Sequence, residues 1–252
     1  MEAGKLIEAR SVLSAAYFSG TLTAPQEAKA REALTKLAEQ TIFSPIVYEG
    51  DPYAISYMLN PGEVLDKVER KLELHVPTQL VLKINNISDA SRIRAGQKIK
   101  MIQGPFHAIV DKSDFTLDIY LQREGLEKIF VKRFAIGLGK DGSTPTGMWH
   151  VAKGRKNLKP VYYPTADSPN HDKGPIAYGA PGYVFGTKGM WIGLEGLEAS
   201  NKTLDNYGIH STNHPESIGK AESEGCIRMV DDDIEWVFSL LYEVWSTVQI
   251  KP

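Results

Sequence analysis

The sequence predicts a mainly β domain over residues 106–252, preceded by a small α+β module over residues 53–103 and a helical hairpin over residues 1–50. Three patterns predict this order. Apolar residues recur at helical spacing near the N-terminus, two short helical patterns lie between strand patterns in the middle, and apolar residues alternate at period two after Gly104. The composition indicates a folded chain, because 42% of the 252 residues are hydrophobic and 24% are charged.

The N-terminal segment carries two helical patterns. Residues 5–18 place apolar side chains on one face, and Gly20 follows as a stop signal. Thr23 and Gln26 have the spacing of a capping box, which predicts that a second helix begins there. A partner-binding repeat of the tetratricopeptide type would need further copies at a fixed period, and we find no second copy. We therefore interpret the hairpin as a packing or spacer element.

Residues 53–103 predict a strand, two short helices and a second strand. The first strand covers residues 53–58, and a turn follows at Asn60-Pro61-Gly62. The helices are expected over residues 64–72 and 79–85, and the last strand over the run from Ile93 to Ile102. The predicted order is therefore βααβ.

This βααβ unit resembles a LysM module. The resemblance depends on Tyr57 in the first strand, the PGEVLDKV opening of the first helix, the Leu82 to Asn86 end of the second helix, and Gly96-Gln97 in the last run. It implies binding to a glycan that contains N-acetylglucosamine, such as peptidoglycan. The family helix usually starts G-D-T-L, whereas this chain has Gly62-Glu63-Val64-Leu65. A packing module without glycan affinity is the alternative.

The C-terminal part predicts strands joined by hairpins and one long loop region. Strands are expected at residues 106–110, 117–121, 129–139, 148–152 and 190–194. Residues 154–189 are rich in Gly, Pro, Asn and Asp, which predicts irregular loops of the kind that form lids or binding walls. A final helix is expected to open at Asp231 or Asp232 and to bury Ile234, Phe238 and Leu241.

The segment from Tyr207 to Asp233 carries the candidate chemistry. Cys226 is the single cysteine, and a reactive thiol needs a base because free cysteine has a pKa near 8.5. His210 is the candidate base. Gly225 allows an unusual backbone conformation, and the amides around it could donate to an oxyanion. Arg228 would share the face of Cys226 on an extended strand and suits a substrate carboxylate.

Two other interpretations of the same residues remain open at this point. His210 and His214, with Cys226 or Glu216, could ligate zinc, although Pro215 disfavours a helix that would present both histidines. A structural thiol beside a satisfied histidine is the second alternative. We expect no metal and no cofactor.

The segment resembles the active-site signature of YkuD-type L,D-transpeptidases, in which a histidine is followed by [ST]-x-G-C and usually by Val or Ile and then Arg. The matching residues are His210, Ser223, Gly225, Cys226, Ile227 and Arg228. Three further elements resemble the family, namely Thr144-Pro145-Thr146-Gly147, Trp191-Ile192-Gly193-Leu194 and Ser217-Ile218-Gly219. Glu224 replaces a histidine often found before the glycine, and Ser211 replaces a glycine often found after the catalytic histidine. The resemblance covers residues 106–251.

The resemblance implies a β-barrel or sandwich domain that catalyses acyl transfer in two covalent steps. Cys226 would attack a peptidoglycan stem peptide and release D-alanine, and a second stem would take the acyl group to form a crosslink. The implied catalytic residues are Cys226, His210 and Gly225, and the implied substrate-binding residues are Arg228, Ser223, Ser211 and Trp191. The implied partners are stem peptides, glycan strands and carbapenem-type β-lactams. The alternative is a LysM peptidoglycan-binding protein whose catalytic domain is an L,D-carboxypeptidase or inactive.

Glu224 is expected to influence Cys226. If the segment is extended through Gly225, residues two apart share a face, so that the carboxylate would oppose formation of the thiolate. It could instead orient His210 or receive the ammonium group of the acceptor.

Charge and hydropathy limit the partners and the location. The net charge of −2 lacks the basic excess that nucleic-acid binding usually needs. No window approaches the length of a membrane span, and the N-terminus lacks the features of a signal peptide. Because peptidoglycan lies outside the cytoplasmic membrane, we expect the cell envelope as the location, with an export signal or anchor trimmed from this chain. A spore-associated protein without an ordinary signal is the alternative.

Overall fold

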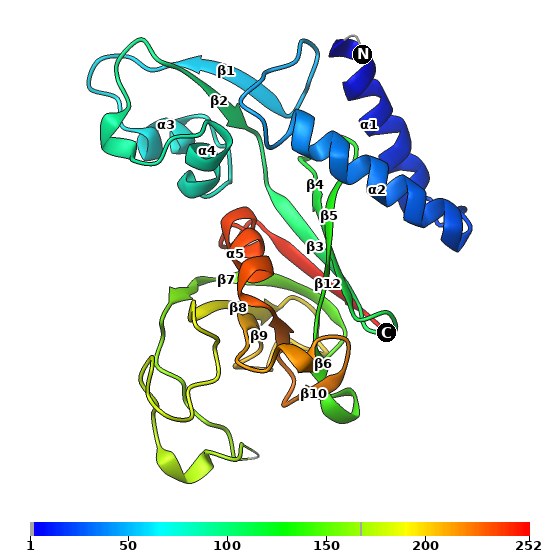
Figure 1. Cartoon of the computed structure of the whole chain (residues 1–252), viewed down its shortest axis with the longest axis vertical. Coiled ribbons are helices and arrows are strands. Elements are labelled where there is room, and N and C mark those ends of the chain that lie inside the picture. The colour runs from blue at the N-terminus through cyan, green and yellow to red at the C-terminus, as the bar shows by residue number, and fades with distance from the viewer. Residues whose placement is uncertain (1–2, 167) are drawn as a thin grey trace. The chain divides into compact units, whose positions relative to one another are not determined.

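The computed structural model describes residues 3–166 and 168–252 and divides into two compact units (Figure 1). The first unit contains the chain up to His107 together with Ile119–Lys132 and Ser239–Tyr242. The second unit contains Ala108–Asp118, Arg133–Phe238 and Glu243–Pro252. The three modules expected over residues 1–50, 53–103 and 106–252 remain a prediction.

The first unit begins with the helical hairpin. Helix α1 covers Ala3–Phe18 and helix α2 covers Ala24–Thr41. The predicted capping box is confirmed, because the backbone amide of Thr23 donates to Gln26 Oε1 at 2.9 Å. On the buried side of the hairpin, Tyr17, Ala30 and Leu34 form a cluster with Phe130, which lies outside the hairpin. Ser14 Oγ accepts a hydrogen bond from the Phe130 amide at 3.1 Å, which fixes the position of this cluster.

A buried polar network joins the hairpin to the rest of the first unit. Arg10 is fully buried and donates to Asp51 Oδ1 at 2.7 Å and to Thr41 Oγ1 at 3.0 Å. Lys100 Nζ donates to the carbonyls of Thr41 at 2.6 Å and Ser44 at 2.9 Å. Burial lowers the pKa of Lys100 to about 8. Buried charges require such partners, since breaking one of these contacts leaves a desolvated ion.

The βααβ order of the middle segment is confirmed. Strand β1 covers Ala54–Met58, helix α3 Leu65–Lys71, helix α4 Thr78–Ile84 and strand β2 Lys98–Ile102. The two strands pair antiparallel, with Ala54 opposite Ile102. The prediction that the last strand runs from Ile93 is wrong in its first half. Gly96 has φ +81° in a turn, so that the strand begins only at Lys98.

An eight-stranded sheet has the order β11-β9-β8-β7-β12-β3-β4-β5. Its members in chain order are β3 Phe106–Asp111, β4 Thr116–Leu121, β5 Ile129–Ala135, β7 Gly147–Leu158, β8 Met190–Gly196, β9 Gly208–Ser211, β11 Ile227–Met229 and β12 Thr247–Lys251. A second pair joins β6 (Leu138–Gly139) to β10 (Ala221–Ser223). The predicted mainly β character of this part is confirmed. β9 and β11 pair in parallel at one edge of the larger sheet, and this edge carries the candidate active site.

Strand β7 is longer than predicted, and the long loop region therefore starts later. The strand continues to Leu158 through a register shift between Val151 and Lys156, where Gly154 has φ +70°. Glu243 stabilises this bulge, because its carboxylate accepts from the amides of Gly154 and Lys156, each at 3.0 Å. The glycine that predicted a loop thus forms a bulge in a continuing strand.

The final helix, α5, covers Asp231–Leu240 as expected, but one of its predicted core residues is wrong. Ile234 and Leu241 are fully buried, and Val237 is buried between them at helical spacing. Phe238 is only partly buried, with Lys156 Nζ 4.4 Å from the centre of its ring. The ring therefore contacts a cation at the edge of the core.

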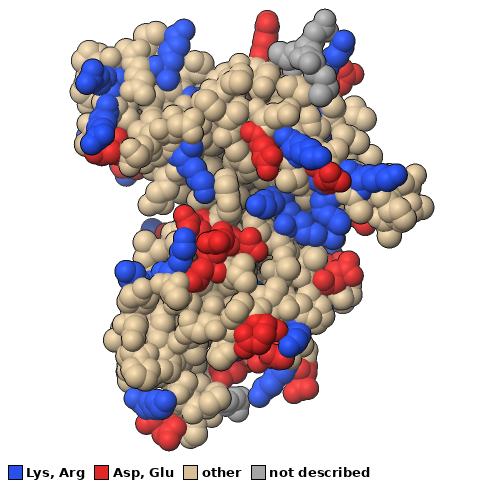
Figure 2. Space-filling view, in the orientation of Figure 1, with Lys and Arg blue, Asp and Glu red and all other residues tan. Residues whose placement is uncertain are grey.

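Charges of both signs are mixed on the face drawn in Figure 2, where Lys and Arg side chains lie among Asp and Glu. This mixture agrees with the net charge of −2. In the described part of the chain, no helix is long and apolar enough to cross a membrane.

Glu69 of α3 should make the stability of the first unit depend on pH. Its side chain is buried, Thr78 Oγ1 donates to Oε2, and Oε1 has no hydrogen-bond partner among the described residues. Burial raises the pKa of Glu69 to about 7. Because the pKa of Glu69 is higher in the folded chain than its usual value of 4.5, protonation of this side chain stabilises the folded state. This contribution to the free energy of unfolding is complete below pH 4.5 and is lost as the pH rises to about 7.

We expect Glu69→Gln to flatten this dependence and to stabilise the chain above pH 7 by on the order of 1–3 kcal/mol. Thermal unfolding between about pH 4.5 and 8 measures the effect. Glu8→Gln, at an exposed position of α1, is the control and should follow the wild type. Equal pH profiles for wild type and Glu69→Gln would contradict the prediction.

Candidate active site

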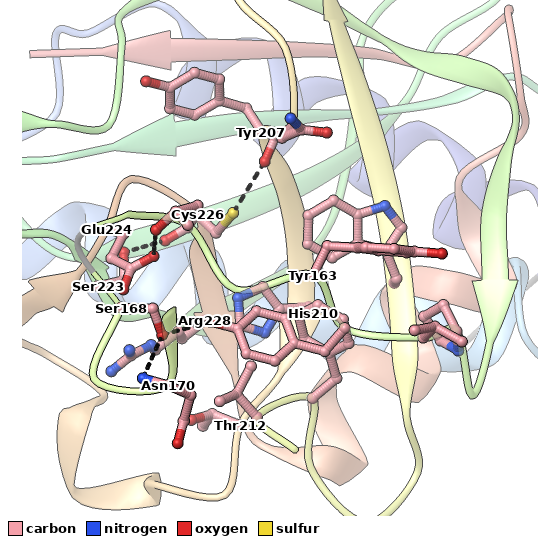
Figure 3. A pocket seen from close by; sticks show the side chains of 18 of the residues that line it. Tyr163, Ser168, Asn170, Tyr207, His210, Thr212, Ser223, Glu224, Cys226 and Arg228 are labelled. Carbon is pink, nitrogen blue, oxygen red and sulfur yellow. Dashed lines mark hydrogen bonds between the residues drawn. The ribbon is translucent and has the colours of Figure 1, made fainter. Parts of the chain in front are cut away.

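A cavity of about 950 Å³ in the second unit contains the predicted catalytic residues (Figure 3). Cys226, His210 and Arg228 all line it, and Figure 3 shows these three side chains around the same space. The parallel pairing of β9 with β11 explains two of the positions, because His210 lies directly opposite Arg228 in the register. Cys226 immediately precedes β11 and therefore lies at the end of the same pair of strands.

A tight turn presents Cys226. Ser223 Oγ donates to the Cys226 carbonyl at 2.7 Å and accepts from the Gly225 amide at 3.1 Å. Gly225 has φ +135°, and a Cβ there would lie 2.7 Å from the ring of Tyr207. Glycine is therefore required both by the backbone conformation and by the close approach of the ring.

Two expectations about this turn are wrong. The segment is not extended through Gly225, because β10 ends at Ser223 and β11 begins at Ile227. Glu224 therefore cannot be placed relative to Cys226 by strand alternation, whereas Arg228, two residues after Cys226, lines the same cavity as expected. The Gly225 amide is also not free to meet an oxyanion, since it donates to Ser223 Oγ.

The thiol of Cys226 is held in its neutral form. Sγ contacts the Asn206 carbonyl at 3.5 Å, and no hydrogen bond joins it to His210 in the part of the chain that the structure describes. Burial raises the pKa of Cys226 to about 11, and the nearby Glu224 carboxylate acts in the same direction. Arg228 opposes this effect because its positive charge favours the thiolate.

The imidazole of His210 is held in one tautomer. Its Nδ1 lies 2.7 Å from the Ser211 carbonyl, which can only accept, so that Nδ1 carries the proton and Nε2 is left with a lone pair. The ring packs against Trp191, stacked at 5.7 Å, and against Phe185 at 4.9 Å, and these two rings also contact each other at 5.1 Å. Burial lowers the pKa of His210 to about 4. At neutral pH the cavity thus contains a neutral thiol and an unprotonated base.

The predicted substrate-binding residues separate into two groups. Arg228, Trp191 and Ser223 line the cavity, although the Ser223 hydroxyl is occupied within the turn. Ser211 does not line it, and its prediction as a substrate-binding side chain is wrong for this structure. The Ser211 side chain is fully buried, donates to the Phe185 carbonyl at 2.5 Å and accepts from the Met190 amide at 3.1 Å. These two hydrogen bonds connect β9, which also carries His210, to the backbone at Phe185 and Met190.

His214 also lines the cavity, where its Nδ1 lies 3.0 Å from Glu216. Among residues 3–166 and 168–252, no group of three His, Cys, Asp or Glu side chains is gathered as a metal site would need. The two histidines of the zinc alternative therefore have separate partners in this structure.

The residues that line the cavity lie within the part of the chain that a family model matches. Residues 105–250 match the family model described as the YkuD L,D-transpeptidase catalytic domain. The chain belongs to the YkuD family of L,D-transpeptidases.

Two relatives of the YkuD family have similar sequences. YkuD of Bacillus licheniformis is 29% identical over 188 residues, which cover 71% of this chain and 89% of that protein. YkuD of Bacillus subtilis is 28% identical over 188 residues with the same coverage of each chain. A solved L,D-transpeptidase from Mycobacterium smegmatis aligns with a TM-score of 0.44 at 17% identity, covering 62% of this chain and 64% of that one.

In this YkuD domain, one wall of the cavity comes from a segment that the sequence had not linked to individual site residues. Residues 159–189 carry an apolar cluster of Tyr162, Ile176, Tyr183 and Phe185, so the segment packs on its own side chains. Its end is tied to α5, because the Thr187 amide donates to Asp231 Oδ2 at 3.1 Å. Thr165, Ser168 and Asn170 from this segment line the cavity. In the sequence, the aromatic residues spaced through this Gly- and Pro-rich region were the pattern that could have indicated a packed wall.

Gly225→Ala should reduce L,D-transpeptidase activity at least about tenfold, because the methyl group would force the Tyr207 ring or the Ser143 carbonyl to move beside the nucleophile. Gly219→Ala is the matched control, since Gly219 has φ +81° with open space around the added Cβ. That substitution carries only the backbone strain of about 1 kcal/mol and should leave activity within about twofold. Initial rates with folded protein measure both, and equal losses would show that close packing at Gly225 does not matter.

Proposed function

We propose that this L,D-transpeptidase crosslinks peptidoglycan by acyl transfer through a thioester on Cys226. The observation that supports the proposal most directly is one cavity that contains a thiol and an imidazole whose Nε2 lacks a proton. Membership of the YkuD family supports the reaction class. The substrate proposed is a stem tetrapeptide that ends in D-alanine.

In the first step, Cys226 must turn from the Asn206 carbonyl toward the substrate, and its proton passes to His210 Nε2. Sulfur attacks the carbonyl carbon between the L-centre of the diamino acid and D-alanine. As the C–N bond breaks, His210 gives the proton to the leaving amine, so that free D-alanine and a thioester result.

In the second step, the amine of another stem attacks the thioester carbonyl and loses a proton to His210. The C–S bond breaks, and the sulfur regains the proton. The product is an amide crosslink and the free thiol. Water in place of the amine would give carboxypeptidase activity.

Other residues have proposed supporting roles. Arg228 can bind the carboxylate of the terminal D-alanine, because its planar guanidinium matches a carboxylate and lines the same cavity. The Trp191 ring supports the substrate and keeps His210 desolvated. Because the Gly225 amide is occupied, the Cys226 amide is the remaining candidate of the predicted pair to stabilise the oxyanion.

Carbapenem treatment should add one drug mass to the wild-type chain and none to Cys226→Ala. Incubation with stem tetrapeptide should release D-alanine and form a dimeric peptide, both visible by mass spectrometry.

His210→Ala should slow acylation by about 10²-fold or more, as general-base catalysis contributes on that order. A wild-type chain that a thiol reagent labels but that neither the drug nor the peptide acylates would contradict the thioester mechanism. Release of D-alanine without a crosslink would identify the carboxypeptidase alternative.

We further propose that the βααβ segment is a LysM module that binds the glycan strand. Its strand and helix order supports this assignment. Tyr57 Oη donates to Glu63 at 2.8 Å, and the Asn60 amide donates to the same carboxylate at 2.9 Å, which orders the loop after β1. Such a module would hold the enzyme on its polymeric substrate in the cell envelope.

The full chain with Cys226→Ala should be retained on insoluble peptidoglycan, and soluble oligomers of N-acetylglucosamine should reduce this retention several-fold. Removing the catalytic thiol keeps stem-peptide acylation out of the assay. If free stem peptide displaces the chain and the sugar oligomers do not, retention depends on the catalytic cavity, and the segment is a packing module.

A further inference from the structure

Glu224 places a carboxylate in the wall of the active-site cavity, two residues before the nucleophile. Its side chain is partly buried, and Oε2 accepts a hydrogen bond from Thr165 Oγ1 in the segment 159–189. Figure 3 shows Glu224 beside Cys226 at the edge of the cavity. The catalytic steps described above give this carboxylate no role.

The negative charge of Glu224 has no direct counter-ion among residues 3–166 and 168–252. Among the residues that the structure describes, Glu224 forms no ion pair, and its bond to Thr165 comes from a neutral hydroxyl. A carboxylate in a partly desolvated cavity attracts a cation, since fewer waters screen the charge. It also disfavours the thiolate of Cys226, as noted above. A cation bound beside Glu224 would therefore offset a penalty that the free enzyme carries.

The position of Glu224 indicates which part of a substrate can reach it. Cys226 Sγ is directed to the Asn206 carbonyl, and in Figure 3 Glu224 lies on the other side of Cys226 from Tyr207. The carbonyl carbon under attack must approach the sulfur, so Glu224 can contact only another part of the same peptide. A diamino acid carries its second amine several bonds from the carbonyl under attack, and at neutral pH this amine is an ammonium group.

We propose that Glu224 binds the side-chain ammonium group of the diamino acid residue whose carbonyl Cys226 attacks, in place of the Thr165 hydroxyl. This inference rests on the proposed function. It makes Glu224 a substrate-binding residue that selects donor stems with a free side-chain amine. Stems whose amine is already acylated, as in an existing crosslink, would be poorer donors.

The test compares two synthetic tetrapeptides ending in meso-diaminopimelyl-D-alanine, one with the side-chain amine free and one with it N-acetylated. Release of D-alanine gives kcat/KM for each peptide. For the wild type we expect the free amine to be preferred at least about tenfold, a ratio typical for loss of a partly desolvated charge pair, and salt should reduce the preference. In Glu224→Gln the ratio should fall to near one, chiefly through slower reaction of the free-amine peptide.

Two variants separate binding from a structural role. Thr165→Val removes the hydroxyl but keeps the carboxylate, and it should retain or increase the preference. If the Thr165 contact were merely structural support for the cavity, Thr165→Val and Glu224→Gln would behave alike, which would overturn the proposal. Glu222→Gln is the matched control, since Glu222 is exposed on β10, pairs with Lys220 at 3.7 Å and should behave as wild type.

The result that overturns the inference is an unchanged ratio in Glu224→Gln. A variant that keeps the ratio but transfers the acyl group to an added amine less efficiently would also overturn it, because Glu224 would then serve the acceptor. Failure of the proposed function gives a different result, in which the wild type releases no more D-alanine from either peptide than Cys226→Ala does.

Discussion

The active site depends on the parallel pairing of two short strands. β9 and β11 bring Ile209 opposite Ile227, both fully or almost fully buried, and this core contact fixes the register. Because side chains alternate along each strand, His210 and Arg228 then occupy the next pair of positions and face the cavity. A shift by one residue would exchange the buried isoleucines with the reactive groups, so packing energy protects the catalytic geometry.

Desolvation sets the chemistry that this geometry supports. The surroundings of Cys226 and His210 favour the uncharged form of both, so the resting enzyme has a thiol and a free base and no preformed ion pair. The proton can therefore move when the substrate is in place, which limits reaction of the resting sulfur with oxidants. The Ser211 carbonyl keeps the accepting nitrogen of His210 directed away from the backbone.

Sequence reasoning recovered the features that depend on local chemistry. The capping box at Thr23 is one example, since it needs only residue type and spacing. The cavity shared by His210 and Cys226 was predicted from their chemistry together with the resemblance to YkuD-type enzymes. It failed where contacts between distant parts of the chain determine the local structure. Gly154 predicted a loop, but Glu243 supplies the hydrogen bonds that let β7 continue through a bulge. Ser211 follows the histidine directly, and only the structure shows that its hydroxyl is buried beneath the Phe185 carbonyl.

The buried contacts of Arg10 and Lys100 bear on how such a protein can be rearranged during evolution. Domains that are exchanged freely between genes meet through few contacts, usually across exposed linkers. Here the Lys100 ammonium donates to two carbonyls at the end of the hairpin, and Arg10 of the hairpin pairs with Asp51 just before β1. A recombination event that transferred the βααβ segment alone would separate Lys100 from both carbonyls and leave its ammonium group without these partners. The hairpin and this segment are therefore expected to be inherited together.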